Sequence, residues 1–454
     1  MRSSSAGWLL GRSRWAGVVA LLVVGAVSGW RPPSVGAHDL CANTGSSQGP
    51  FDVVAYEAKD WRQVYSDTLS LAAFDGLFPD DPYFGLPLME KGPRDERDTA
   101  EVRYIPPVIL KAIGWIESNW IQAWYDVPYG AIGPALISHD CGYGIMQVTS
   151  GMQNTTGTPT PQQLMVAAHY AYNIARGAWT LADKWNAAPE ARPIVGDGDP
   201  AIVEDWYYAV WSYNGFAFKN HPLNPAYSEW PRPSFSCGPP DDGLGHDRSQ
   251  YPYQELVFGC MGNPPQLVVE EDEERLPLWQ PQEATLPDLG LEEVFNAMLN
   301  FFVFQDEKMD IPRPESSHTD PSELAGEREA IVGAPQMAMA ARDFTFQLFK
   351  DGTEPATDAE PIEIRNLGTG QLVWMAVPSA SWIVVSPPQG IALGSDLGDL
   401  ASAFTVTVNA VGLEPGHYQG TVTVVAPFTA ADPTAIDVGL TVFDRAFLPG
   451  VFKE

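Results

Sequence analysis

Basic residues are scarce in this sequence of 454 residues, which holds 26 lysines and arginines against 57 aspartates and glutamates. The formal net charge of −31 argues against nucleic acid or an anionic membrane as a partner, because both carry dense negative charge. A surplus of acid is also an ordinary way of keeping an exported protein soluble. The charge therefore excludes classes of partner without naming one.

Histidine and cysteine are also few. The seven histidines are scattered without metal-ligand spacing, and no Cys-x-x-Cys pair occurs, so we expect neither a metal nor another cofactor. The four cysteines allow up to two disulfides, with three possible connectivities. We favour Cys237 with Cys260, because they bracket a loop rich in Gly, Pro and Asp, which leaves Cys41 to pair with Cys141.

An apolar run of membrane-spanning length is missing from the N-terminus. Residues 1–37 contain four arginines and no acid, and the almost purely apolar stretch 15–29 has the length of a signal peptide. Small residues at 35–37 suit a cleavage site, although an uncleaved anchor would have a similar sequence. We therefore predict an exported protein, extracellular or associated with the cell envelope, with residues 1–37 as its signal peptide.

The remaining chain contains enough apolar and aromatic residues for two or three domains. Residues 38–263 are rich in Trp, Tyr and Ala and predict a mainly α domain, whereas 264–342 form an acidic, Pro-rich linker with one amphipathic helix at 291–304. In residues 343–444, apolar and polar residues alternate with period two, which predicts an all-β antiparallel sandwich. A tail follows at 445–454. The seven expected strands are 344–350, 361–366, 373–377, 382–386, 404–409, 416–425 and 435–443.

Several motifs of the strand-rich segment carry a family resemblance. They are Asn-Leu-Gly at 366–368, Trp374, the run 381–387 and the run 416–421. Together they resemble the BACON family of immunoglobulin-like modules over roughly 343–443. That family is associated with carbohydrate-active enzymes, so the resemblance implies an additional carbohydrate or envelope partner. No sugar-stacking platform is evident, and we expect Trp374 and Trp382 to pack in the core or at the edge of a spacer.

The helical segment contains one acid with a special environment. Residues 105–118 predict a helix that begins with proline and carries apolar residues at positions 109, 113 and 116. Glu117 lies beside this buried stripe, where partial desolvation raises a carboxyl pKa. Such an acid can protonate the leaving oxygen of a glycoside, a contribution of about 10²–10⁴-fold. Taken alone, however, a glutamate on an apolar helix more often lies at the edge of the buried face and pairs with a lysine or a backbone group.

Three motifs that follow Glu117 strengthen the interpretation. Residues 142–148 (Gly-Tyr-Gly-Ile-Met-Gln-Val) place two glycines before an apolar-amide run, which suits a tight turn against a ligand. An Ala-rich helix is expected at 162–185 and includes Asn-Ile-Ala-Arg-Gly at 173–177. An aromatic helix at 206–215 ends in Asn-Gly, which is a stop signal that exposes Tyr213 and Asn214.

This order of motifs closely resembles the soluble-type lytic transglycosylases, whose fold is like goose-type lysozyme, over residues 105–215, with a possible extension to Tyr253 and Val257. The resemblance implies that one glutamate protonates the MurNAc-GlcNAc β-1,4 bond of peptidoglycan glycan strands. The same residue, as base, then lets the muramyl C6 hydroxyl close a 1,6-anhydro ring. The family's catalytic residue falls on Glu117, with Tyr213 expected to orient it. The implied substrate-binding residues are Ser118, Tyr143, Ile145, Met146, Gln147, Tyr213 and Asn214.

Two alternatives stay open. A lysozyme-like hydrolase needs a second carboxylate, for which Asp126 and Asp140 are the candidates. Goose-type lysozymes carry an Asp directly after the Gly-Leu-Met-Gln-Val segment, where this chain has Thr149, and the insert 120–140 is longer than expected of the family. A non-catalytic glycan-binding envelope protein could keep the fold, but it would have no need of an ionisable group at Glu117.

Overall fold

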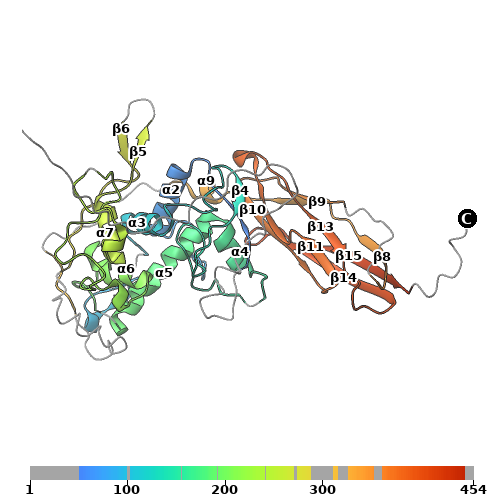
Figure 1. Cartoon of the computed structure of the whole chain (residues 1–454), viewed down its shortest axis with the longest axis horizontal. Coiled ribbons are helices and arrows are strands. Elements are labelled where there is room, and N and C mark those ends of the chain that lie inside the picture. Colours follow the sequence, from blue (N-terminus) through green and yellow to red (C-terminus); the bar gives the residue numbers. More distant parts are fainter. Residues whose placement is uncertain are drawn as a thin grey trace, which may run out of the picture. The chain divides into compact units, whose positions relative to one another are not determined.

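The computed structural model describes residues 51–99, 103–154, 156–191, 193–240, 242–269, 274–287, 310–314, 326–351 and 360–444. Every described residue belongs to one compact unit, which spans 37–454. The expected signal peptide, the helix at 291–304, Cys41 and the tail lie outside the described residues. The described part has a helical N-terminal region and a β-rich C-terminal region (Figure 1).

The helical region is built from short helices around a buried aromatic core. Helix α3 packs against α2 and α7, and α6 packs against α5 and α7 (Figure 1). The helices are α2 (Trp61–Ala73), α3 (Pro107–Ser118), α4 (Pro161–Ala168), α5 (Tyr170–Ala191), α6 (Tyr207–Tyr213), α7 (Tyr253–Gly262) and α9 (Arg328–Val332). Short 3-10 turns are η2 (Arg94–Glu96), η3 (Glu204–Trp206), η4 (Phe218–Asn220), η5 (Arg248–Gln250) and η6 (Ser395–Leu397). Two small antiparallel pairs join β1 (Val54–Tyr56) to β4 (Ile132–Pro134) and β2 (Glu90–Lys91) to β3 (Asp98–Thr99).

The prediction of one helix over 162–185 is wrong, because two helices meet at His169. The backbone of His169 is extended, and its buried ring accepts a hydrogen bond from the Ala171 N–H through Nδ1, at 3.2 Å. Burial lowers the pKa of His169 to about 3 and keeps the ring neutral. The predicted apolar face is nevertheless buried on both sides of the break.

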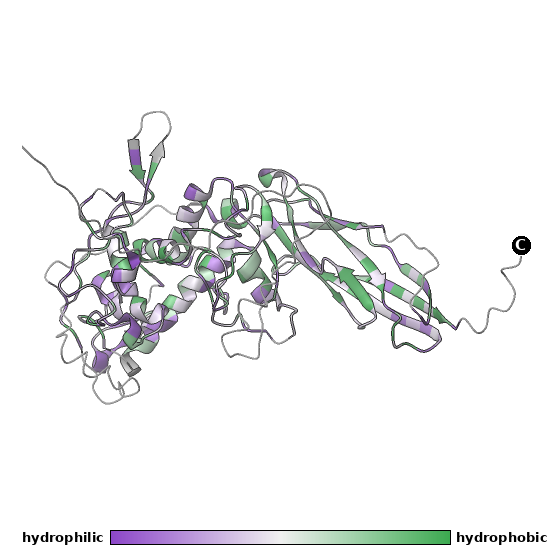
Figure 2. Cartoon of the chain, viewed as in Figure 1, coloured by the Kyte–Doolittle hydropathy of each residue, from purple (hydrophilic) through white to green (hydrophobic). Residues whose placement is uncertain are grey.

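The β-rich region is a sandwich whose strands interleave hydrophobic and hydrophilic residues (Figure 2). All seven predicted strands are present, 416–425 with the predicted bounds and the others with shifted ends, and two more described strands complete the sheets. One sheet has the order β12-β10-β14-β15-β8 and the other β11-β13-β9-β7. Their bounds are β7 (Met337–Met339), β8 (Phe344–Phe349), β9 (Ile362–Asn366), β10 (Gln371–Pro378), β11 (Ile383–Ser386), β12 (Gln389–Leu393), β13 (Ser402–Val408), β14 (Gly416–Val425) and β15 (Thr434–Phe443).

The purely antiparallel arrangement predicted for the sandwich is wrong at one pair. Strands β8 and β15 run parallel, in register from Phe344 opposite Val438 to Phe349 opposite Phe443. Period-two alternation shows which side of a strand is buried but not which way the neighbouring strand runs. The direction of this pair was therefore not readable from the pattern.

Strand β12 escaped prediction because both of its faces are buried. Its Ile391 and Leu393, together with Val373 and Met375 of β10, belong to the same buried cluster as the helical region. The alternate residues of these strands, such as Trp374, lie in the separate core of the sandwich. A strand covered on both faces loses its alternation. The sandwich is thus packed onto the helices through one sheet, and Trp374 and Trp382 are buried as expected of a spacer.

The segment expected to be a plain linker contains structure of its own. Strands β5 (Gln266–Val269) and β6 (Glu274–Pro277) pair as a hairpin, and the buried Trp279 packs on Trp120 with ring centroids 5.4 Å apart. Farther on, Arg313 forms an ion pair with the buried Asp205 at 2.6 Å. The acidic composition predicted a solvated connection and gave no signal for these contacts.

A disulfide joins Cys237 to Cys260, as predicted, with their Cα atoms 5.0 Å apart. Cys141 is also disulfide-bonded. Among the described residues, no helix has both the length and the apolar character needed to cross a membrane.

Candidate active site

Helix α3 stops immediately after Glu117 and Ser118, so that this acid stands at a helix end. Asn119 and Trp120 both take positive φ angles, 56° and 57°, which turns the chain back along the helix. The Trp120 indole then donates to the Lys111 carbonyl at 3.0 Å. A Cβ at Gly114 would lie 3.2 Å from the Trp120 ring, so the glycine provides the space for this turn.

The Gly-Ile-Met-Gln segment forms a tight turn that is fixed to α3 and α5. Gly144 has φ +65°, and a Cβ there would lie 2.5 Å from the Gln122 side chain. Asn173 of α5 accepts a hydrogen bond from the Met146 N–H at 2.8 Å and donates to the Tyr143 carbonyl at 2.6 Å. The Ser118 hydroxyl lies 2.9 Å from the Ile145 carbonyl. The residue after Glu117 therefore ties the end of α3 to this turn.

Two tyrosines from later helices reach this region, and they have different partners. The Tyr253 hydroxyl, at the start of α7, donates to Glu117 Oε1 at 2.6 Å. The Tyr213 hydroxyl, at the end of α6, donates instead to the Met146 carbonyl at 2.8 Å. The direct hydrogen bond to Glu117 that was expected of Tyr213 is thus made by Tyr253, while Tyr213 acts on Glu117 only electrostatically. The proline before Tyr253 was the available signal, because it marks the first turn of a helix.

The environment of Glu117 favours its protonated form. Burial raises the pKa of Glu117 to about 7, against smaller opposing effects of the Tyr253 hydrogen bond and of the positive charges on Arg248 and Lys219. The negative charge of Asp140 contributes in the same direction as burial. A carboxyl group with this pKa holds a proton for part of the time at neutral pH, as a general acid requires.

Most of the predicted substrate-binding residues support the site instead of lining it. Tyr143, Ile145 and Met146 have no exposed surface, and Ser118 is buried. Gln147, Tyr213 and Asn214 are partly exposed. The Gln147 amide donates to the Gly144 carbonyl at 2.7 Å, which leaves its side-chain oxygen for another donor. Of the predicted substrate-binding residues, Gln147, Tyr213 and Asn214 therefore reach the surface, whereas the apolar residues of the turn hold it in place.

The two candidate second carboxylates differ in their relation to Glu117. Asp126 and Asp140 are both exposed. Asp140 accepts a hydrogen bond from the Ser138 hydroxyl and acts electrostatically on Glu117. Of the two, Asp140 is the one that belongs to the surroundings of the candidate acid.

Glu57 was missed by sequence reasoning, although it is the most deeply buried acid near the insert. One of its oxygens accepts backbone N–H groups of Gln122 and Ala123, both at 2.9 Å, and the other accepts the Tyr65 hydroxyl at 2.7 Å. Burial raises the pKa of Glu57. The signal was an acid inside the apolar run 51–58. Its three donors indicate a structural role, which is to fix the start of the insert after α3.

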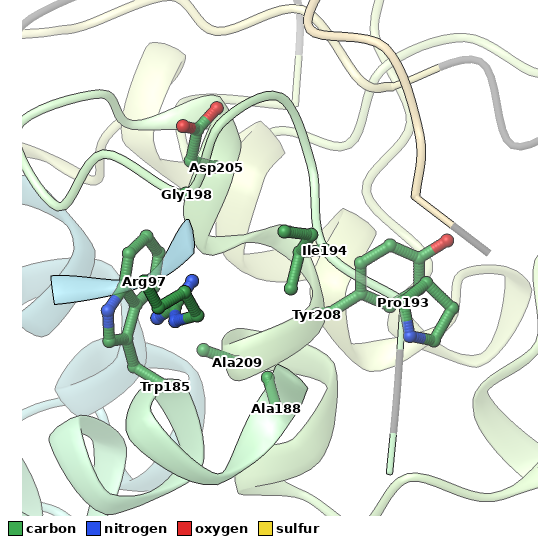
Figure 3. A pocket seen from close by; sticks show the side chains of 9 residues that line it. All are labelled: Arg97, Trp185, Ala188, Pro193, Ile194, Gly198, Asp205, Tyr208 and Ala209. Carbon is green, nitrogen blue, oxygen red and sulfur yellow. The ribbon is translucent and has the colours of Figure 1, made fainter. Parts of the chain in front are cut away.

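Two cavities lie away from Glu117. Figure 3 shows the smaller, of about 10 Å³, with Arg97, Trp185, Tyr208 and Asp205 around it, which is room for about one water molecule. The larger, of about 320 Å³, is lined by the buried ion pair of Arg232 with Glu255 and by residues that precede and follow α7. Glu117 lines neither cavity.

Residues 345–435 match the BACON_2 family, described as the viral BACON domain. The sandwich contains a BACON domain. No curated protein matches the chain. Among solved structures, a Bacteroides ovatus GH5 xyloglucanase in complex with a XXXG heptasaccharide is 22% identical, with 24% of this chain and 19% of that chain covered and a TM-score of 0.17. The Escherichia coli chaperone DraB is 13% identical, with coverages of 24% and 56% and a TM-score of 0.18.

A third structure, the ASH/PapD-like domain of human CEP192, is 14% identical, with coverages of 29% and 99% and a TM-score of 0.20. The chain thus spans about a fifth of the xyloglucanase and just over half of DraB. At these TM-scores the three structures carry no argument about this chain. The BACON match concerns the sandwich, and Glu117 lies outside it.

Replacing Tyr253 with Phe should test how Glu117 is held. Because the lost hydrogen bond stabilises the ionised carboxyl, the variant's Glu117 pKa should rise above its present value of about 7. If Glu117 is a catalytic acid, the alkaline limb of the pH–activity profile should move to higher pH, while activity at pH 7 changes by less than about tenfold. Tyr213→Phe is the matched control: it loses the bond to Met146, so stability should fall by about 1 kcal/mol while the limb stays. An unmoved limb in Tyr253→Phe would contradict the assignment.

Proposed function

We propose that this protein is an exported peptidoglycan lytic transglycosylase with Glu117 as its acid and base. The observation that carries the proposal is the half-buried Glu117 carboxyl, held by Tyr253, with a pKa of about 7. Around it stand the turn 144–147 and the ends of α6 and α7, in the order of motifs that resembles the family. A packing residue at a helix end would not need this combination of burial and a hydroxyl donor.

The proposed reaction uses one carboxyl group twice. Protonated Glu117 gives its proton to the oxygen of the β-1,4 bond between MurNAc and GlcNAc as that bond breaks. The resulting carboxylate then takes the proton of the muramyl C6 hydroxyl, whose oxygen attacks C1 and closes the 1,6-anhydro ring. The proton count balances and no water is consumed. An acid whose pKa is near the working pH suits both steps, because it must lose and regain a proton in each cycle.

A lysozyme-like hydrolase remains the second candidate, favoured by one observation. The negative charge of Asp140 helps to raise the pKa of Glu117. An inverting enzyme needs such a second carboxylate to activate water. Thr149, which stands where goose-type lysozymes carry an Asp, weighs against this candidate. Asp140 is also exposed and bonded to Ser138, so its position has a local structural explanation.

Digestion of purified peptidoglycan separates these functions. The full chain is incubated with intact sacculi, and the released muropeptides are weighed by mass spectrometry. Products with 1,6-anhydromuramyl ends, 18 Da lighter than hydrated ones by the loss of one water, support the transglycosylase. Reducing ends indicate the hydrolase, and binding without release indicates a non-catalytic envelope protein. Asp140→Asn should leave anhydro-product formation intact if Glu117 acts alone.

The pH dependence of kcat/KM follows from the protonation state of Glu117. Since the acid must be protonated to start the reaction and its pKa is about 7, kcat/KM should be flat below pH 6 and fall about tenfold per pH unit above 7. Initial rates on soluble glycan strands between pH 5 and 9 check this. A decline that begins near pH 4.5, the ordinary value for glutamate, would contradict the role of burial.

For the BACON sandwich we propose a spacer role. Its Trp374 and Trp382 are buried. The residues of β10 and β12 that point away from the core of the sandwich are covered by the helical region. Isothermal titration of the full chain carrying Glu117→Gln with soluble glycans other than peptidoglycan would reveal a separate carbohydrate partner, and such binding would contradict the spacer.

A further inference from the structure

The larger cavity, of about 320 Å³, lies beside α7 and has the size of a small-molecule site. We call it the α7 cavity. The disulfide between Cys237 and Cys260 ties the loop before α7 to the helix. The Cys237 N–H donates to the Asn263 carbonyl at 2.9 Å, and the Gln282 N–H donates to the Met261 carbonyl at 3.0 Å. Because these bonds join the loop, the helix and the segment after β6, the walls of the cavity are preformed.

Three charged side chains are among the described residues that line the α7 cavity. Arg232 and Glu255 form an ion pair, with Nε 2.9 Å from Oε2 and side chains only 2% and 4% exposed. The Arg232 guanidinium also donates to the carbonyls of Ser228 and Pro222, so it is turned toward acceptors of the protein. Glu283 is exposed and forms no ion pair in the described part of the chain. With both carboxyls ionised, two negative charges and one positive charge disfavour an anion here.

The acceptors of the α7 cavity have capacity left for a donor. Burial raises the pKa of Glu255 to about 7 although Arg232 opposes this, so one guanidinium does not fully compensate the buried carboxylate. The Asn263 amide donates to the Gly259 carbonyl at 3.3 Å, which leaves its side-chain oxygen for another donor. A second positive group that donates hydrogen bonds would therefore be stabilised beside Glu255.

Much of the remaining lining is apolar. Phe235 and Phe258 bring two aromatic rings, and Leu244 and Leu286 bring aliphatic side chains. Aliphatic side chains favour methylene groups, and aromatic rings also attract cations. A ligand that matches both parts of the cavity has a positive end and an apolar stem.

We propose that the α7 cavity binds an alkylamine, with Glu255 and Glu283 accepting from its ammonium group and the apolar side chains surrounding its stem. An ammonium group has three donors and no acceptor, as this lining requires. The same chemistry occurs in a free small amine and in the side chain of a lysine within a peptide. Because Glu117 does not line the cavity, the inference stands apart from the proposed function.

The test is isothermal titration of the full chain with three five-carbon probes that differ in charge: pentylamine, pentanol and pentanoate. Pentylamine should bind about fivefold more tightly than pentanol, typical of one partly exposed charge pair, and pentanoate should bind most weakly. Tighter binding of Nα-acetyl-lysine amide than of pentylamine would identify a peptide lysine, and weaker binding would identify a free amine. The proposal is overturned if pentanol or pentanoate binds as tightly as pentylamine, or if pentylamine does not bind.

Two variants place the binding in the α7 cavity. A Cβ at Gly262 would lie 3.6 Å from its nearest neighbour, an ordinary contact, so Gly262→Leu should fit and fill the cavity. We expect this variant to lose pentylamine binding to the limit of detection while its urea unfolding stays that of a folded protein. Glu283→Gln removes an exposed charge without disturbing the buried pair, and it should weaken binding about fivefold, less so in high salt.

The matched control is Glu329→Gln, which removes an exposed acid of α9 and should leave pentylamine binding unchanged. An equal loss in this control would mean that the general negative charge of the protein attracts the amine, and it would overturn the site. Unchanged binding in Glu283→Gln would do the same, even if Gly262→Leu fails to fold.

Discussion

Glu117→Gln should reduce the release of muropeptides by at least about 10²-fold, to the limit of detection. Glutamine keeps the shape of the side chain and can still accept the Tyr253 hydrogen bond, but its amide has no acidic proton to transfer. Under the proposed function the same residue is acid and base, so neither half of the reaction survives. The measurement is the quantity of anhydromuropeptides from a fixed mass of sacculi, against wild type at pH 6. Residual activity above a few per cent would contradict the assignment of the catalytic acid.

The same variant also provides its own control for folding. Folding raises the pKa of Glu117 from 4.5 to about 7, so the native state disfavours the ionised carboxyl. This group costs no stability below pH 4.5, and its cost grows as pH rises through the window from 4.5 to 7. Glu117→Gln should therefore unfold at higher denaturant concentration than wild type at pH 8.5, and at a similar concentration at pH 4. A less stable variant at pH 8.5 would show that packing, not charge, dominates at this position.

Asn173→Ala should lower the free energy of unfolding by about 2–5 kcal/mol. The side chain accepts from the Met146 N–H and donates to the carbonyls of Tyr143 and Val166, at 2.8, 2.6 and 2.9 Å. Asn173 is fully buried, so its removal leaves these backbone groups without replacement by water. The turn 144–147 should loosen, and activity should fall with stability. Urea unfolding followed by circular dichroism measures the loss.

Asn186→Ala is the matched control for that prediction. Asn186 also bonds two backbone groups, the Glu90 N–H at 2.9 Å and the Leu88 carbonyl at 2.9 Å, but it is partly exposed. Water can take over both bonds, so a loss below about 1 kcal/mol is expected. Similar losses in the two variants would mean that burial of Asn173 does not decide its contribution.

Local patterns in the sequence predicted the helices and strands better than the contacts between them. The proline start and apolar stripe of α3 placed Glu117 at a half-buried helix end, and alternation located seven sandwich strands. The break at His169 was not readable, because a long alanine-rich face does not show where a buried ring interrupts it. The strand β12 and the parallel pairing of β8 with β15 depend on neighbours distant in sequence, which no short window contains.

In the candidate site, too, the sequence predicted local features but not long-range contacts. The glycine at 144, the serine after Glu117 and the Asn-Gly end of α6 were each visible in the sequence motifs, and the first two have a local geometric reason in the structure. The hydroxyl that bonds Glu117 comes from Tyr253, 136 positions away, and the cations come from two further loops. Long-range contacts of this kind follow from how α7 packs on α3, so the sequence could name the acid but not its surroundings.

The parallel pairing of the first strand of the larger sheet with its last strand also has a mechanical meaning. Because β8 and β15 run the same way, the chain enters β8 at Phe344 and leaves β15 at Phe443, at opposite ends of one ladder. Tension applied through the chain on either side of this pair pulls the strands past one another along their length. All the ladder's hydrogen bonds then resist together, in shear, instead of opening one after another. Built this way, the sandwich is suited to remain folded while transmitting force.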